Sequence, residues 1–385
     1  MPPLLFDLSM RVGLSLLAIA LCLFLIQASA RFGFSRLLTR YALITHSTAV
    51  ADAAIQLTPS DPDAQRARAA TLNDQQQHGE AANSLAAAVA LRYRDDYLWI
   101  ELGNTREEIG DTTGALAALD QAVHWAPYYA HPRWQRGNLL LRMNRTDQAF
   151  ADLRQAATAN PKYFPNLIDL AWGISKGDLK TTESLVNIRN DNERLALIRY
   201  LAGKSFRDAF TLAYGSATTS FLNRGFEDPF VLNDVTFGWI VAPEQKNRLT
   251  IDVSEAVEGK KSLRIIFDGD WNPDRPVLSQ TIVVEPEKTY RISFHVKTKD
   301  LVSGGPPLIT VKDATTNQLL GKSLSFPSTT NPWLGLEVIF TTLSSSQAAV
   351  VRLERNNCDS APCPIFGTLW LDQFKIEQTK SPIKQ

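Results

Sequence analysis

The stretch Tyr97–Pro127, YLWIELGNTREEIGDTTGALAALDQAVHWAP, decides the fold of the first half of the chain. Small residues recur in it at intervals that suit two closely packed helices, and a proline closes it. The residues that set this pattern are Trp99, Leu102, Gly103, Gly110, Ala115, Ala122 and Pro127. We therefore expect a helical hairpin in which small side chains allow close approach, while Leu and Trp fill the gaps.

The pattern repeats along the chain every 34 residues. The matching positions form five series: Ala54, Ala88, Ala122 and Ala156; Ala81, Ala115 and Ala149; Leu85, Leu119 and Leu153; Gly103 and Gly137; and Pro59, Pro127 and Pro161. A single hairpin cannot bury its apolar face alone, so consecutive hairpins must stack. The sequence therefore predicts a helical solenoid.

These spacings resemble the tetratricopeptide repeat family over about 120 residues. The sequence departs from that family at Arg106, Arg133 and Arg136, where aromatic or apolar residues are usual. The resemblance implies a concave groove that binds a protein or peptide partner. The alternative is a spacer or dimer interface that binds nothing else. Residues 164–215 no longer follow the spacing, and we expect two divergent helical hairpins there.

The amino-terminal stretch Val12–Ala30 contains 19 residues and no charge. As a helix it would be roughly 28 Å long, close to a hydrocarbon core of ~30 Å. It is either a retained single-pass anchor or a cleaved signal peptide, since residues 28–30 read Ala-Ser-Ala. Both readings export the main domains to the periplasm or the exterior, and the second makes the protein secreted. Arg31, Arg36 and Arg40 oppose export, because positive charge favours the cytoplasmic side.

The residues after Ser220 alternate in short segments rich in Val, Ile, Thr and Phe. Turn sequences such as EPEK (285–288) and SGGPP (303–307) separate these segments. About nine strands in about 160 residues predict a two-sheet antiparallel sandwich or jelly roll.

Three segments of this region resemble the jelly-roll domains of carbohydrate-binding modules and galactose-binding-like folds: NRGFE (223–227), GKKSLRIIFDG (259–269) and LWLDQFKIEQ (369–378). The resemblance implies a structural calcium ion held by the carboxylates of Glu227 and Asp372. The alternative is that both are ordinary exposed residues. It also implies a possible glycan ligand.

Sugar binding needs flat aromatic surfaces on which the C–H faces of pyranose rings stack. Trp271 lies in a polar loop and is the candidate platform, whereas Trp239 and Trp370 lie in apolar strand patterns typical of core, and Trp333 fits either role.

Acidic residues surround Trp271 in the stretch DGDWNPD, residues 268–274. Side chains that carry oxygen alternate in it as they do in a calcium loop. However, Pro273 and Ser279 stand where that loop requires glycine and glutamate. We expect a solvated loop there.

Two of the three cysteines, Cys358 and Cys363, stand close together in NNCDSAPCP. Such a pair can close a small disulfide loop, which persists in oxidising compartments and so favours export. The alternative is two free thiols. Cys22 lies within the apolar segment.

The sequence shows no convincing catalytic motif. The five histidines, His46, His78, His124, His131 and His295, lack the spacing of a zinc protease site, and no G-x-S-x-G motif occurs. Lys and Arg together number 40, as do Asp and Glu, so there is no basic excess for nucleic acid. We expect a protein without enzymatic activity or a nucleic-acid partner.

The expected fold is multidomain. Residues 1–40 form the transmembrane or signal segment, 41–217 an all-α repeat solenoid, and 218–385 an all-β jelly-roll sandwich. The leading hypothesis is a noncatalytic adaptor of the bacterial cell envelope, in polysaccharide assembly or export. The alternative is a carbohydrate-binding protein whose repeats serve as a spacer.

Overall fold

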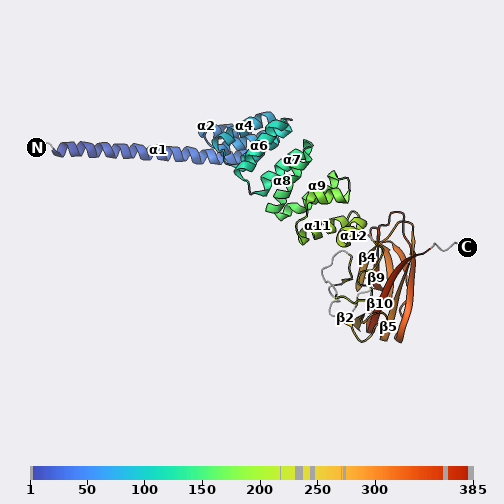
Figure 1. Cartoon of the computed structure of the whole chain (residues 1–385). Coiled ribbons are helices and arrows are strands. Elements are labelled where there is room, and N and C mark those ends of the chain that lie inside the picture. Colours follow the sequence, from blue (N-terminus) through green and yellow to red (C-terminus); the bar gives the residue numbers. More distant parts are fainter. Residues whose placement is uncertain are drawn as a thin grey trace. The chain divides into compact units, whose positions relative to one another are not determined.

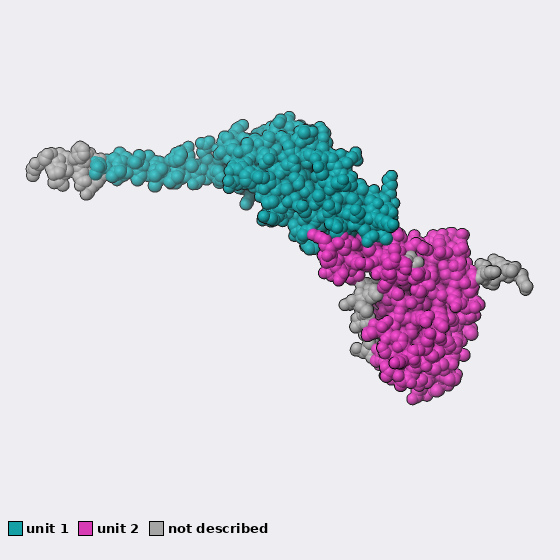
Figure 2. Space-filling model, viewed as in Figure 1, with its two compact units in different colours: residues 1–187 teal, residues 188–385 magenta. Residues whose placement is uncertain are grey.

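The computed structural model describes residues 3–216, 218–229, 237–242, 248–269, 271, 275–358 and 363–379. The chain divides into two compact units, Met1–Asn187 and Ile188–Gln385 (Figure 2). The predicted fold class is confirmed, since helical hairpins are followed by two antiparallel sheets (Figure 1).

The first unit consists of antiparallel helices and one short 3-10 turn at Pro161–Tyr163. The helices are α1 (Pro3–Thr45), α2 (Thr48–Leu57), α3 (Pro62–Asp74), α4 (His78–Leu91), α5 (Asp96–Glu108), α6 (Thr112–Trp125), α7 (Ala130–Arg142), α8 (Thr146–Ala159), α9 (Phe164–Ile174) and α10 (Leu179–Val186). An aspartate caps the start of four of them: Asp61 accepts from the amide of Asp63, Asp95 from that of Tyr97, Asp111 from that of Gly114, and Asp178 from that of Thr181. These caps satisfy amides that the helix itself leaves without partners.

Small residues lie where the helices approach most closely. Ala54, Ala88, Ala122 and Ala156 are each 0% exposed. A Cβ atom on Gly103 would lie 2.8 Å from Cγ of Leu119, and Gly137 stands in the same relation to Leu153. Pro127 and Pro161 are exposed and follow the ends of α6 and α8.

Helix α1 combines two environments in one continuous rod. From Val12 it is long and apolar enough to cross a membrane, with a mean hydropathy of 2.3, and its apolar side chains up to Phe34 are exposed. Its last third packs on the repeats: Ala42 is 0% exposed and the Ser35 hydroxyl donates to the carbonyl of Ala54 at 2.9 Å. The first hairpin is therefore α1 with α2, although we expected a half repeat beginning near Tyr41.

The second unit contains two helices and ten strands among its described residues. They are α11 (Asp191–Ala202), α12 (Phe206–Tyr214), β1 (Ile240–Val241), β2 (Leu249–Asp252), β3 (Ser262–Gly269), β4 (Leu278–Val283), β5 (Thr289–Ser303), β6 (Pro307–Asp313), β7 (Leu319–Lys322), β8 (Thr329–Thr341), β9 (Ala348–Arg355) and β10 (Ile365–Thr379). One sheet has the order β1-β4-β9-β6-β7 and the other β2-β3-β10-β5-β8, with every pair antiparallel.

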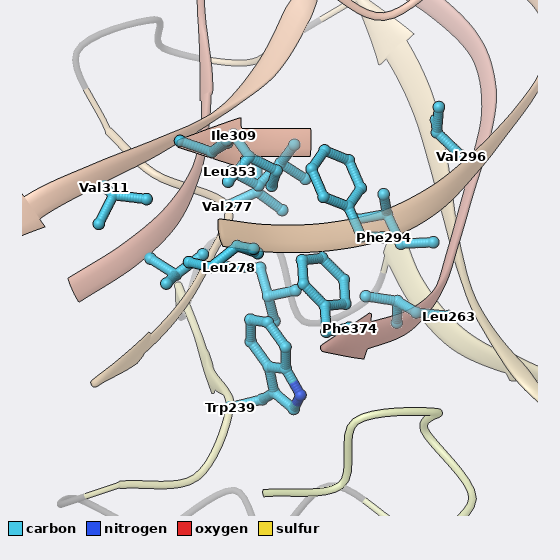
Figure 3. Close-up of a cluster of buried hydrophobic side chains, with 14 of the residues drawn as sticks. Trp239, Leu263, Val277, Leu278, Phe294, Val296, Ile309, Val311, Leu353 and Phe374 are labelled. Atoms are coloured by element: carbon cyan, nitrogen blue, oxygen red, sulfur yellow. The ribbon is translucent and has the colours of Figure 1, made fainter. Parts of the chain in front are cut away.

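The core of the sandwich lies between the two sheets and is built from alternate residues of each strand (Figure 3). Leu263, Ile265 and Phe267 of β3 point inward, as do Leu369 and Leu371 of β10. Aromatic rings fill the centre, where Phe294 stacks on Phe374 at 5.1 Å between ring centroids. The two-residue period of the sequence thus becomes one buried face per sheet.

The second unit begins at Ile188, some way before the expected boundary after residue 217. Helix α12 accounts for this difference, because it packs on the sandwich. The ring of Phe210 meets that of Phe237 at 4.9 Å, and the amide of Phe206 donates to the side chain of Gln347 at 3.3 Å.

Candidate functional site

The first unit contains a groove of about 860 Å³. It is lined by α1, α3 and α5, together with Leu85 of α4, and most of the lining is polar: Arg36, Thr39, Arg40, Asp63, Arg66, Asn73, Glu101, Asn104 and Thr105. Its apolar lining includes Phe32, Leu43, Ala67 and Ala70. A groove of this size falls within the ~300–1,000 Å³ of typical ligand pockets.

Most charges in this groove are already paired. Arg36 contacts Asp63 at 2.6 Å, and Arg66 contacts Glu101 through both Nε and a terminal nitrogen. Burial of Asp63 opposes its ionisation, yet the neighbouring Arg92 and Arg36 hold the pKa of its carboxyl below the ordinary value. These ion pairs neutralise the arginines on the floor of the groove, so its surface is not uniformly positive.

Two polar side chains of the groove remain available. Among the described residues, no hydrogen bond or ion pair engages the side chains of Arg40 and Asn104, which are exposed. Asn73 nearby donates to the hydroxyl of Thr105 at 3.0 Å. The groove therefore presents one unpaired guanidinium and one free amide, which suit the carboxylates and backbone of an extended peptide.

Two of the three arginines that depart from the repeat pattern, Arg133 and Arg136, have a structural role that the sequence did not reveal. Arg136 contacts Asp152 at 2.6 Å and Asp120 at 2.8 Å, and Arg133 contacts Asp152 at 3.3 Å. The carboxylate of Asp152 is almost completely buried, at 4% exposure. These two arginines compensate a buried charge within the hairpin of α7 and α8, and Arg136 also links this hairpin to α6.

The amino-terminal unit therefore uses its predicted small and apolar residues for packing. Leu102, Ala115 and Ala149 are at most 1% exposed. Trp99 is partly buried beside them, and its indole N–H donates to the carbonyl of Tyr93 at 2.7 Å.

Trp271, the candidate sugar platform, is placed in the core, and that assignment is corrected. Its ring is 4% exposed and lies parallel to Phe267 at 5.3 Å, while the guanidinium of Arg355 covers it at 5.4 Å. With only 4% of Trp271 exposed, its ring offers no open face on which a sugar could stack. The N–H of Trp271 donates to the carbonyl of Arg275 at 2.9 Å.

Two other tryptophans of the sandwich, Trp239 and Trp370, are also poorly placed for stacking. Trp239 is 6% exposed among the rings of Phe226 and Phe374 (Figure 3). Trp370 is 7% exposed and donates to Asp252 at 2.9 Å. Trp333 on β8 is partly exposed.

Glu227 and Asp372, the candidate calcium ligands, lie close together in the structure. A Cβ atom on Gly225 would stand 3.5 Å from Oδ1 of Asp372 and 3.9 Å from Cγ of Glu227. Backbone amides of one loop serve both carboxylates: Val257 donates to Asp372 at 2.7 Å, and Lys260 to Glu227 at 2.7 Å.

The electrostatics of this pair suit a cation. Asp372 is 0% exposed, and no ion pair reaches it among the described residues. Burial and the negative charge of Glu227 raise the pKa of Asp372, although amide hydrogen bonds act in the opposite direction. A bound calcium ion would compensate both for the burial of the Asp372 carboxylate and for its repulsion by Glu227. No three Asp, Glu, His or Cys side chains cluster as a metal site in the described part of the chain, so backbone carbonyls or water would supply the other ligands.

The second acidic cluster contributes little to a metal site. Asp268 pairs with Arg248 at 2.7 Å. Asp270, Asn272 and Asp274 lie outside the described residues.

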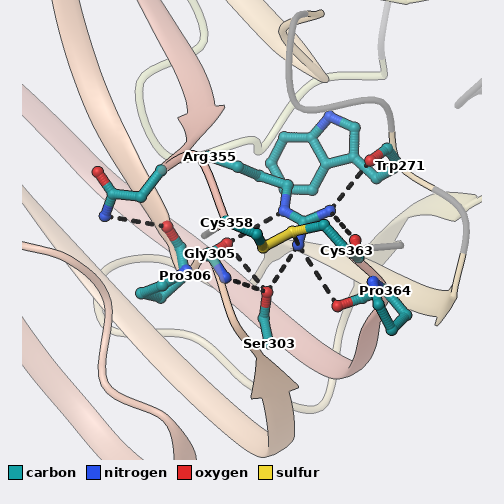
Figure 4. The surroundings of a disulfide bond; sticks show 9 residues. Trp271, Ser303, Gly305, Pro306, Arg355, Cys358, Cys363 and Pro364 are labelled. Carbon is teal, nitrogen blue, oxygen red and sulfur yellow. Dashed lines mark hydrogen bonds between the residues drawn. A yellow bond between two sulfur atoms is a disulfide. The ribbon is translucent and has the colours of Figure 1, made fainter. Parts of the chain in front are cut away.

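Cys358 and Cys363 form a disulfide at the end of β9, beside a buried arginine (Figure 4). Arg355 is 5% exposed and donates only to neutral acceptors among the described residues, which include the carbonyls of Gly305, Trp271 and Cys363 and the hydroxyl of Ser303. Burial lowers the pKa of Arg355. The disulfide thus lies against the polar network that encloses Trp271.

Comparison with known proteins gives one family match and several similar structures. Residues 218–360 match the family described as "Carbohydrate binding domain". The chain is similar to MamA, residues 41 to the end, from Desulfovibrio magneticus RS-1, with 17% identity over 45% of this chain and 96% of that chain and a TM-score of 0.36. It is similar to YrrB, described as "a TPR protein with an unusual peptide-binding site", with 17% identity, 44% and 89% coverage and a TM-score of 0.33.

A third similar structure is the CBM22-1 xylan-binding domain from Paenibacillus barcinonensis Xyn10C, with 21% identity, 42% and 94% coverage and a TM-score of 0.28. No curated protein matches the chain. The chain therefore combines helical hairpins with a 34-residue spacing, which resemble tetratricopeptide repeats, and a β-sandwich region that matches the carbohydrate binding domain family over residues 218–360.

Proposed function

We propose that this protein is a noncatalytic, membrane-anchored adaptor of the bacterial cell envelope. It holds a protein partner in the groove of its repeats and serves polysaccharide assembly or export. The observation that carries the proposal is the open groove of about 860 Å³, with paired charges on its floor and an unpaired Arg40.

The partner is an extended segment with acidic side chains. Arg40 offers a guanidinium to a carboxylate, and the amide of Asn104 can bond to a peptide backbone. Because the other cations of the groove already have partners, a strongly acidic tract gains little beyond one or two contacts. Its affinity therefore depends moderately on salt.

The continuity of α1 supports a retained anchor. Its apolar part and the residues that line the groove belong to the same rod, so the groove lies near the membrane surface. Arg36 and Arg40 follow Ala30 by roughly 9 Å and 15 Å of helix. The carbohydrate-binding-type domain follows the repeats and is directed to glycan outside the cytoplasm.

The test is affinity purification of the full chain from detergent-solubilised envelopes. The variant Arg40→Glu should lose the partner that the native chain retains, whereas Lys180→Glu, an exposed cation outside the groove, should keep it. Retention of the same partner by both variants would reject the groove as its site. Recovery of the chain alone from native envelopes would reject the adaptor function.

The second candidate function is a carbohydrate-binding protein in which the repeats are a spacer. The family match of residues 218–360 favours it. On affinity gels containing insoluble polysaccharide, this function predicts retardation of the full chain and no partner in the groove. Retardation that accompanies partner capture would instead support the adaptor.

A further inference from the structure

A second hollow of the first unit, of about 560 Å³, lies at the ends of the repeat helices and not in the groove. It is formed by the start of α5, the loop between α6 and α7, and the turn after α8. Tyr129 and Tyr163 stand 34 residues apart, as do Tyr97 and His131. Successive repeats therefore contribute equivalent positions to one hollow.

The hollow presents more free aromatic surface than packing requires. Tyr128 is 90% exposed, Tyr129 69% and Tyr97 60%. Tyr163 stacks on Trp134 with 4.7 Å between the ring centroids. This stacking fixes the orientation of the Tyr163 ring at the edge of the hollow. Exposed aromatic rings gathered around a concavity indicate a ligand-binding surface.

Planar polar groups stand among these rings. Asp96 supplies a carboxylate and Asn160 an amide, whose oxygen accepts from the amide of Lys162 at 3.1 Å. His131 shares a hydrogen bond with Gln135 at 3.1 Å, and its ring lies 5.9 Å from that of Tyr97. Carboxylate, amide and imidazole groups bond to hydroxyls as donors or acceptors.

The remaining lining discriminates between ligand classes. It consists of Ala130, Pro132 and Ala159, without Leu, Ile, Val or Met and without Lys or Arg. Branched aliphatic side chains would be expected in a pocket for protein anchor residues, and cations in a site for an acidic glycan. Rings combined with uncharged donors and one carboxylate suit the C–H faces and hydroxyls of a neutral sugar.

On the sandwich, Trp239, Trp271 and Trp370 are buried, whereas Trp333 is partly exposed and Phe366 is 48% exposed. None of the described aromatic residues of the sandwich lines a hollow like that of the tyrosines. We propose that the tyrosine hollow, bounded by Tyr97, Tyr128, Tyr129 and Tyr163, is a saccharide-binding site for a neutral pyranose oligosaccharide. This inference rests on the glycan part of the proposed function and gives the repeat unit a second ligand.

The experiment is isothermal titration calorimetry of the full chain in detergent with cellohexaose, xylohexaose, mannohexaose and chitohexaose. At least one of them should bind. Tyr128→Ala should weaken that binding about tenfold, Tyr128→Phe should preserve most of it, and Asp96→Asn should weaken it. Tyr41→Ala, an exposed tyrosine outside the hollow, is the matched control and should change nothing.

Three results would overturn the assignment: binding that Tyr128→Ala and Tyr129→Ala both leave unchanged, no binding of any of the four sugars, or tyrosine-dependent binding of decaproline in place of sugar. The first places the sugar elsewhere, and the last makes the hollow a peptide site. Partner capture through Arg40 is measured separately, so a failure here leaves the groove proposal standing.

Discussion

Gly103 shows how a single atom controls the packing of a repeat. Its missing Cβ would lie 2.8 Å from Cγ of Leu119 and 3.2 Å from the carbonyl oxygen of Ala115. Gly103→Ala should therefore destabilise the repeat unit by about 1–3 kcal/mol, because neither the core leucine nor the backbone can easily move. Urea unfolding followed by circular dichroism measures this change.

The matched control for that substitution is Gly79→Ala in α4, where an added Cβ meets nothing within 4 Å. Alanine there should stabilise the protein by up to about 1 kcal/mol through helix propensity. Equal effects of the two substitutions would show that close packing is not the reason for glycine at position 103.

Asp372 is the residue on which the calcium proposal depends. Calcium should raise the melting temperature of the native chain, because the ion compensates a buried carboxylate beside Glu227. Asp372→Asn should abolish that rise, and Glu258→Gln, an exposed carboxylate of the same loop, should preserve it. Identical melting curves of the native chain in calcium and in chelator would contradict the site.

The pH dependence of this effect has a definite sign. The pKa of Asp372 is raised, mainly by burial, so the folded state takes up a proton more readily than the unfolded chain. Without metal, this group contributes most to stability at low pH, and the contribution falls as pH rises through the folded-state pKa. Calcium requires the ionised form, so its stabilising effect should weaken on acidification earlier than for an ordinary aspartate.

Residue roles could be predicted from sequence where local spacing determines them. The small residues of the repeats recur at fixed intervals, and these intervals follow from helix geometry. The pairing of Arg136 with Asp152 depends on how two helices cross, which spacing alone does not reveal. Trp271 was assigned as an exposed sugar platform because its neighbours in the sequence are polar. Those neighbours do not show that Phe267 and Arg355 pack against its ring.

Helix α1 is the element whose extent differs most from expectation. Its apolar composition predicted a segment ending at Ala30, yet the helix continues to Thr45 and completes the first hairpin. No helix-ending proline or glycine pair interrupts it, and Ser35 and Thr39 are buried against the repeats. The apolar segment and the first repeat helix are therefore one element.

Truncation within α1 tests that conclusion. A chain beginning at Arg31 retains the contact of Arg36 with Asp63 at 2.6 Å and the buried Ala42. A chain beginning at His46 loses both and exposes α2 and α3. Its melting temperature should be lower by about 5 °C or more. Equal melting temperatures would show that the end of α1 adds no stability to the repeats.

Strands were predicted more reliably than the helices that adjoin them. Alternation of apolar and polar residues defines β3, β5 and β9 directly, because one face of each sheet is buried. The attachment of α12 to the sandwich was not predicted, since it arises from tertiary contacts such as Phe210 with Phe237.

At the scale of the whole molecule, the disulfide allows a test of the compartment in which the second unit folds. Cys358 and Cys363 are joined, while Cys22 is free and exposed on α1. Alkylation of unreduced protein from cells, followed by mass spectrometry, should modify Cys22 alone. Modification of all three cysteines would indicate a reducing compartment and contradict export.

The central claim is that the groove of the repeats holds a protein partner at the membrane. The most direct measurement is photocross-linking in living cells, with a benzophenone amino acid at Ala70 in the groove and, as control, at the exposed Glu108. The account predicts one discrete adduct with another envelope protein at Ala70, its loss on Arg40→Glu, and no such adduct at Glu108. The same adduct at both positions, or none at Ala70, would contradict it.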